Sequence, residues 1–290
     1  MTGARSLHLV SPPPKVLPPS REDARRNLIA RLVSAALLLP PVAVIVALGS
    51  WPFALLCALA AAGCTAELLA MPDGRVHPVD AYPVMLSAAL ALGLARGGGA
   101  WLAPGLVAAT LGLLVVHVAS TRPVEARRRS ASLAALAWLA FALPLALLGS
   151  LRLEHGGGAV ALALGVAWCN DAGAFFVGRS LGKSKLAPAL SPAKTWEGFW
   201  GGLVAGIAGT FAVRALFLPT MGVRETLVVG LGAGLLGPLG DLAIAMLKRS
   251  FGLKDSSPVI PGHGGLLDRL ASLLAIAPWT WLVLQVWPPS

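Results

Sequence analysis

Nine apolar runs of about twenty residues dominate this 290-residue chain and restrict the folds that it can adopt. A helix needs about 20 apolar residues to cross the ~30 Å hydrocarbon core of a bilayer. The runs are continuous rather than alternating, which favours helices over the strands of a membrane barrel. We therefore expect an all-α polytopic integral membrane protein with about nine transmembrane helices, at residues 30–49, 51–71, 81–97, 100–120, 131–151, 157–178, 198–218, 225–247 and 266–287.

The composition excludes a soluble enzyme. Charged residues make up 12% of the chain and hydrophobic residues 56%, whereas an average soluble domain has about 25% charged residues. Glycine-rich stretches within the spans, such as 201–209 and 230–240, predict close packing of helices. The three cysteines lie in apolar stretches without C-x-x-C spacing, so we expect neither a disulfide framework nor a zinc site.

The positions of the basic residues predict the topology. With the N-terminus in the cytoplasm, cytoplasmic segments contain all but four of the 23 Lys and Arg residues, as the positive-inside rule requires. The net charge of +10 then reflects topology and not nucleic-acid binding. We expect a multi-pass protein of the cell inner (plasma) membrane. The four exceptions are Arg96, Arg152, Arg214 and Arg224.

Three regions are predicted along the chain. Residues 1–27 are basic and Pro-rich without an apolar period, which indicates a disordered cytoplasmic arm. Residues 28–155 contain about five spans, the first of which reads as a retained anchor rather than a cleaved signal peptide. Residues 156–290 contain about four spans and the chemically richest segments, so we expect a catalytic region there with its active site at the cytoplasmic face.

Four carboxylates fall inside or at the edge of the predicted spans: Glu67, Asp171, Asp241 and Asp268. A carboxylate in the bilayer costs at least a few kcal/mol, so each needs a partner or a function. All four lie within about two turns of the predicted cytoplasmic ends. An ion-coupled transporter remains an alternative, but it would place such charges near the midplane.

The first rich segment begins after the sixth span and runs from Asn170 to Gly198. We expect a loop here, followed by a helix with Ser191 as N-cap and Pro192 at its first position. A helix N-terminus with Lys194 beside it would form an anion site.

The second rich segment runs from Asp241 to Arg269. Asp241 and Lys248 are seven residues apart and share one helix face, and Asp268 opens the next span, where it can meet Asp241. Two carboxylates flanked by basic residues suit a Mg²⁺ ion that also binds phosphate oxygens. The glycine-rich turn at 261–265 could bring bare backbone close to a phosphate.

Simpler readings of the same residues stay open. Asp241 and Asp268 could form ion pairs with Arg249 and Arg269 alone, and Lys248 and Arg249 could serve only the topology. His263, in a glycine-rich loop, could be merely solvated.

Residues 246–269, with Met-Leu-Lys-Arg, Lys-Asp and Pro-Gly-His-Gly-Gly-Leu-Leu-Asp-Arg, closely resemble the signature of phosphatidate cytidylyltransferases, also called CDP-diacylglycerol synthases. The run from Asp171 through Ser-Pro-Ala-Lys-Thr-Trp-Glu-Gly resembles the second block of that family. Together they cover about residues 168–272. Two positions depart from the expected pattern: Ala245 stands where a Ser is usual, and Ala271 where an Asp is usual.

The resemblance implies that CTP and phosphatidic acid react to give CDP-diacylglycerol and pyrophosphate at the surface of the lipid bilayer. It implies Mg²⁺ held by Asp241 and Asp268, with Asp171 as support, a further monovalent cation and a homodimer. The other catalytic residues would be Lys248, Arg249, Lys254 and Asp255. Substrates would be bound by Lys194, Glu197, Ser191, Gly262, His263, Gly264, Gly265 and Arg269, together with Asp171. Alternatives are a CTP-dependent lipid kinase, an isoprenoid-lipid cytidylyltransferase or an inactive homologue.

Overall fold

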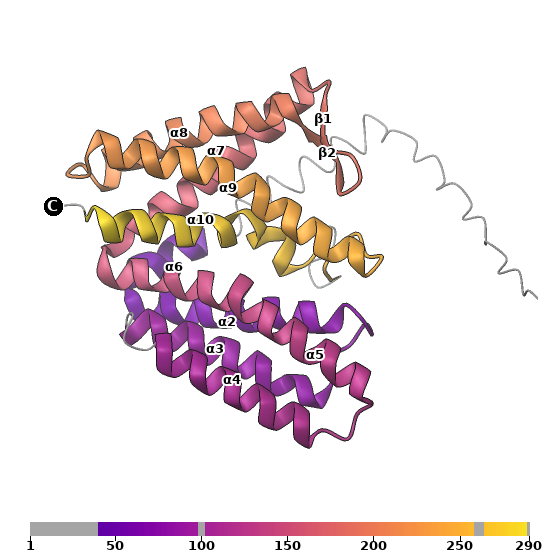
Figure 1. Ribbon diagram of the computed structural model, residues 1–290. Helices are drawn as coiled ribbons and strands as arrows, with labels where there is room; N and C mark the ends of the chain where they lie inside the picture. The colour runs from indigo at the N-terminus through magenta and orange to yellow at the C-terminus, as the bar shows by residue number, and fades with distance from the viewer. Residues whose placement is uncertain (1–39, 98–101, 258–263, 289–290) are drawn as a thin grey trace, which may run out of the picture. The chain divides into compact units, whose positions relative to one another are not determined.

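The computed structural model describes residues 40–97, 102–257 and 264–288. The predicted N-terminal arm and the first half of the first predicted span, residues 30–39, lie outside these residues. In the second half of that span, residues 40–48 are helical. The chain divides into two units, Met1–Pro40 and Pro41–Ser290, and the second contains every labelled helix and strand in Figure 1.

Helices make up nearly all of the second unit. The first group consists of α2 (Ser50–Ala70), the short 3-10 helix η1 (Pro78–Asp80), α3 (Ala81–Gly97), α4 (Leu102–Ala119), α5 (Val124–Ala137), a π-helical turn (Trp138–Ala142) and α6 (Leu143–Glu154). The second group consists of α7 (Gly156–Leu181), the strands β1 (Lys185–Ala187) and β2 (Ser191–Thr195), α8 (Trp196–Phe217), α9 (Val223–Ser250) and α10 (Leu266–Val286).

Seven helices of the described residues are long and apolar enough to cross a membrane. They correspond to seven of the predicted spans, while α4 falls just short in length. Large apolar side chains such as Leu59, Val204 and Leu239 are exposed on these helices, whereas Phe53 and Ile276 are buried. Exposed apolar surface of this extent suits lipid rather than water. The protein is thus a helical, polytopic membrane protein, as the sequence predicts.

Contacts between helices connect the two groups. Within the first group α3 packs on α2 and α6, and within the second α7 packs on α8 and α9 on α10. Helix α10 also contacts α2 and α6, so it joins the C-terminal helices to the N-terminal ones (Figure 1).

Glycines bring α7 and α8 into backbone contact, which confirms the predicted close packing. A Cβ atom added at Gly173 would lie 2.7 Å from the Gly201 carbonyl oxygen and 2.4 Å from the Ala205 Cβ. Only a residue without a side chain allows this approach. Helix α7 continues to Leu181, so it contains the predicted span 157–178 and ends three residues beyond it. The first part of the rich segment, from Asn170 to Leu181, is therefore helix and not loop.

The predicted helix start at Ser191 is also wrong. Ser191 lies opposite Ala187 in an antiparallel pair of strands, and α8 begins five residues later. The cap is Thr195, whose Oγ1 accepts a hydrogen bond of 3.1 Å from the Gly198 N–H. Pro192 fits the strand because a two-stranded ribbon has only edges, where a missing N–H is tolerated.

Candidate active site

Charged side chains gather where α9 ends and α10 begins. These helix ends lie on the same side of the second unit as the β1–β2 hairpin (Figure 1). The hairpin leads into α8, and the α9–α10 connection includes residues outside the described ranges. Two lysine–aspartate pairs stand at this end of the helices.

The first pair, Lys194 and Asp241, joins the hairpin to α9. Lys194 of β2 donates a 2.6 Å hydrogen bond from Nζ to Oδ2 of Asp241. Asp171 of α7 is close enough to Asp241 and Lys194 to interact with both electrostatically. Its Oδ2 also accepts a 3.1 Å hydrogen bond from the Ser272 hydroxyl of α10. Four separate elements therefore meet in this cluster.

The second pair, Lys248 and Asp268, joins α9 to α10. Lys248 donates to Oδ1 of Asp268, and both side chains are largely buried. The other carboxylate oxygen of Asp268 accepts from the backbone N–H of Ser256 at 2.9 Å and of Gly265 at 3.2 Å. Asp268 therefore caps its own helix while it pairs with Lys248.

Each of the two aspartates pairs with a lysine. Asp241 and Asp268 pair with Lys194 and Lys248, respectively. Arg249 is exposed and donates to the Leu253 carbonyl at 3.1 Å.

The remaining predicted residues surround the two pairs in different ways. Glu197 accepts the Ser184 backbone N–H at 3.1 and 3.2 Å, which ties the start of α8 to the hairpin. Lys254, Asp255 and Arg269 are exposed. Gly262 and His263 lie outside the described residues.

Gly264 and Gly265 have a structural reason to be glycine. Gly264 has a φ of +76°, and a Cβ there would lie 2.7 Å from Oδ2 of Asp268. A Cβ at Gly265 would lie 2.4 Å from Oε2 of Glu67. In this structure the bare backbone of the turn approaches two carboxylates.

The predicted site residues do not include Ser256, Ser272 or Glu67, which all make hydrogen bonds in this region. The serines carry no sequence signal of their own. Glu67 does carry a signal, because it is a carboxylate within an apolar span, but its partners lie about 190 to 200 residues away in the chain.

Residues 29–287 match the profile of the cytidylyltransferase family, which is most of the chain. The chain belongs to this family. It is 42% identical to the phosphatidate cytidylyltransferase of Bacillus subtilis over 121 residues, 42% of this chain and 45% of the relative. It is also 44% identical to that of Brucella suis over 117 residues, 40% of this chain and 43% of the relative. The matched segments thus span less than half the length of these relatives.

The two departures from the expected family pattern lie on the facing helices α9 and α10. Ala245 stands between Asp241 and Lys248 along α9. Ala271 is buried, and a Cβ at Gly240 would lie 2.4 Å from its carbonyl oxygen. The backbones of the two helices therefore touch directly beside Asp241.

Carboxylate oxygens are ligands that Mg²⁺ prefers, and Asp241 and Asp268 each present one carboxylate to a lysine at this end of the helices. Mg²⁺ commonly uses only one or two protein carboxylates and shares its other sites with phosphates. Among the described residues, no group of three or more His, Cys, Asp or Glu side chains is arranged to hold a metal ion.

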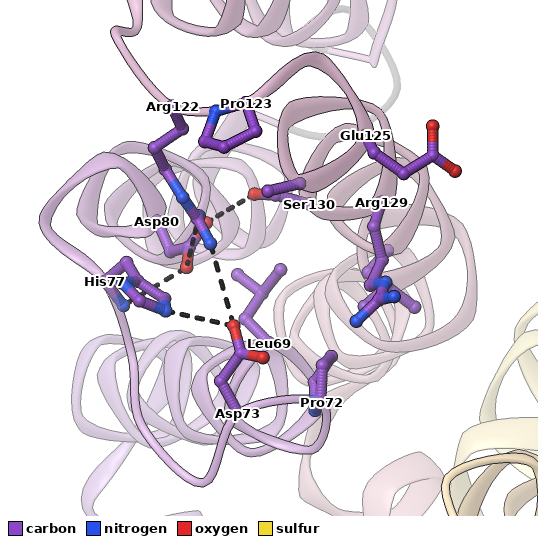
Figure 2. A pocket seen from close by; sticks show the side chains of 12 residues that line it. Leu69, Pro72, Asp73, His77, Asp80, Arg122, Pro123, Glu125, Arg129 and Ser130 are labelled. Atoms are coloured by element: carbon purple, nitrogen blue, oxygen red, sulfur yellow. Dashed lines mark hydrogen bonds and ion pairs between the residues drawn. The ribbon is translucent and has the colours of Figure 1, made fainter.

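A second polar cluster lies just after the end of α2 (Figure 2). Arg122 stands 3.6 Å from Asp73 and 3.9 Å from Asp80, and His77 contacts Asp73 at 3.0 Å. Ser130 donates to Asp80 beside a cavity of about 270 Å³. The charges are paired within the cluster, which ties the α2–α3 connection to the start of α5.

Proposed function

We propose that this member of the cytidylyltransferase family is a phosphatidate cytidylyltransferase, which converts CTP and phosphatidic acid to CDP-diacylglycerol and pyrophosphate. The observation that carries the proposal is the arrangement of Lys194–Asp241 and Lys248–Asp268 at one end of α9 and α10. The relatives named phosphatidate cytidylyltransferase support it, with identities of 42% and 44% over the matched segments.

In the proposed reaction a phosphate oxygen of phosphatidate attacks the α-phosphorus of CTP. A new phosphorus–oxygen bond forms, the bond from the α-phosphorus to the bridging oxygen breaks, and pyrophosphate leaves. No strong base is required, because a phosphomonoester has a second pKa of about 6 and is largely ionised near pH 7. The protein's task is to position the two substrates and to offset their negative charge.

Asp241 and Asp268 are proposed to hold Mg²⁺, which when bound would offset charge on the phosphates. Lys194 and Lys248 lie against these carboxylates. In the proposed complex they would bind phosphate oxygens. Arg249, Lys254 and Arg269 are exposed around them and would add to the attraction for two anionic substrates. The remaining expected roles, those of Ser191, Glu197, Asp255 and the turn at 262–265 in substrate binding or catalysis, belong to the same proposal.

The finer topology is part of the proposal. We place the N-terminus in the cytoplasm, with about nine spans in the cell inner membrane and the site at the cytoplasmic face. CTP is cytoplasmic, and phosphatidate presents its headgroup at the membrane surface. A homodimer and a monovalent cation, both implied by the family resemblance, remain predictions.

The proposal is tested with purified protein in detergent, given labelled CTP, phosphatidic acid and Mg²⁺. We expect CDP-diacylglycerol and pyrophosphate in equal amounts, and loss of turnover by at least about 100-fold in Asp268→Asn. Glu125→Gln is the matched control, because Glu125 is also ion-paired but lies on α5 and is exposed. A wild-type protein without product, under conditions in which an authentic enzyme works, would refute the function.

A further inference from the structure

Glu67 is a buried carboxylate of α2 that the proposed reaction does not use. Its Oε1 accepts hydrogen bonds of 2.8 Å from the Ser257 hydroxyl and 2.8 Å from the Leu266 N–H. Its Oε2 accepts 2.8 Å from the Ser256 hydroxyl and 3.0 Å from the Leu267 N–H. All four donors come from the other end of the chain.

These donors lie at both ends of the segment that leads from α9 to α10. Ser256 and Ser257 precede the residues outside the described range, and Leu266 and Leu267 are the first two residues of α10. The first N–H groups of a helix have no acceptor within the helix. A carboxylate placed there satisfies them and also interacts favourably with the helix dipole. Glu67 therefore caps α10 from a different helix.

The capped turn carries Asp268. Ser256 contacts both carboxylates, at 2.8 Å from Glu67 and 3.1 Å from Asp268. A hydroxyl has one hydrogen and can donate it fully to only one acceptor. Because Glu67 is the closer acceptor, Oδ2 of Asp268 relies mainly on backbone N–H groups, and Oδ1 faces Lys248.

We propose that Glu67 is a positioning residue for Asp268. It joins α2 to both ends of the α9–α10 connection and thereby sets the direction in which the first turn of α10 presents Asp268. This inference rests on the proposed function for its catalytic consequence, but the positioning itself is a property of the fold. Partners that orient a metal-binding carboxylate typically affect metal affinity or activity by about 10- to 100-fold.

Glu67→Gln is a demanding test because it changes the shape of the side chain very little. It replaces one acceptor oxygen with an NH₂ donor, which must face either the Leu266 or the Leu267 N–H. A hydroxyl can rotate to accept from the amide, but a backbone N–H cannot. Glu67→Asp keeps both acceptors on a shorter side chain and should therefore retain part of the effect.

Asp80→Asn is the matched control. Asp80 is buried, lies close to α2 in sequence and accepts hydrogen bonds from Ser130 and the His77 N–H. Within the described part of the chain, Asp80 contacts Ser130, the His77 N–H and Arg122, which belong to the cluster of Figure 2. A general loss of stability would appear in both variants.

The experiment combines hydrogen–deuterium exchange of residues 264–268 with steady-state kinetics over a range of Mg²⁺ concentrations. In Glu67→Gln we expect faster exchange there, kcat lower by about 10- to 100-fold and a higher half-saturating Mg²⁺ concentration. Glu67→Asp should fall between Glu67→Gln and the wild type, and it carries the test if Glu67→Gln does not fold. Asp80→Asn should keep wild-type values for all three measurements.

Unchanged exchange at 264–268, or faster exchange with wild-type kcat and Mg²⁺ dependence, would overturn the positioning role. Equal effects in Asp80→Asn would also overturn it, because they would indicate general destabilisation. A wild-type protein without cytidylyltransferase activity would refute the proposed function instead. The exchange measurement would then still decide whether Glu67 holds this turn.

Discussion

A lysine ammonium and a divalent cation compete for the same carboxylate oxygens. In this protein Lys194 and Lys248 lie on the two aspartates that we propose as metal ligands. Charges of opposite sign that are partly shielded from water depend on one another, since removal of one partner leaves the other unpaired. The pairs therefore contribute to the stability of the protein as well as to its chemistry.

Lys248→Met should lower thermal stability, because Asp268 would keep its backbone donors but lose its cation. We expect a cost of about 1–3 kcal/mol in the free energy of unfolding. The double variant Lys248→Met, Asp268→Asn should recover most of this loss, since no unpaired charge remains, yet stay inactive. Thermal unfolding in detergent without Mg²⁺ measures the coupling. Additive destabilisation would show that the two side chains do not depend on each other.

At the scale of elements, close helix packing brings the polar groups together. Helix α7 contributes Asp171 because it lies directly against α8, and α9 contributes Asp241 because its backbone touches α10 at Gly240 and Ala271. Glycine and alanine at these contacts leave no side chain between the helices. The position of each carboxylate thus depends on a backbone contact within two residues of it.

Gly173→Ala should separate α7 from α8, because the added Cβ would meet the Gly201 carbonyl at 2.7 Å. Overpacking of this kind costs about 1–3 kcal/mol, so the unfolding temperature and the activity should both fall. Gly93→Ala in α3 is the matched control, since a Cβ there meets nothing within 4 Å. It should be neutral or slightly stabilising. Equal unfolding temperatures for the two variants would contradict the packing argument.

At the scale of the whole molecule, the N-terminal helices do more than anchor the chain. Helix α10 contacts α2 and α6 as well as its neighbours α7 and α9. Glu67 adds direct hydrogen bonds between α2 and the α9–α10 connection. The two groups of helices therefore share one polar site, even though the family signature lies in the C-terminal group alone.

The proposed topology predicts which exposed turns face the cytoplasm. In a Cys169→Ser background, where the remaining Cys57 and Cys64 are buried, Thr220→Cys should react with a membrane-impermeant maleimide in intact cells. Lys183→Cys should react only after the membrane is permeabilised. Both positions are exposed, so access alone should decide the result. Labelling of Lys183→Cys in intact cells would reverse the orientation.

Local patterns in the sequence were sufficient for seven of the predicted spans and for the family resemblance. Continuous apolar runs identify membrane helices because the bilayer imposes a minimum length on each span. Local patterns failed at Ser191, where pairing with Ala187 replaces the expected helix start. Contact with another strand there overrode a local preference.

The sequence by itself determined that this is a helical membrane protein with acidic and basic residues grouped in its C-terminal half. Only the tertiary structure decided that Asp241 pairs with Lys194 and Asp268 with Lys248, and that Glu67 reaches α10. The physical reason is distance. Hydrophobic length is a property of each segment alone, whereas an ion pair between groups far apart in the chain depends on how the helices pack.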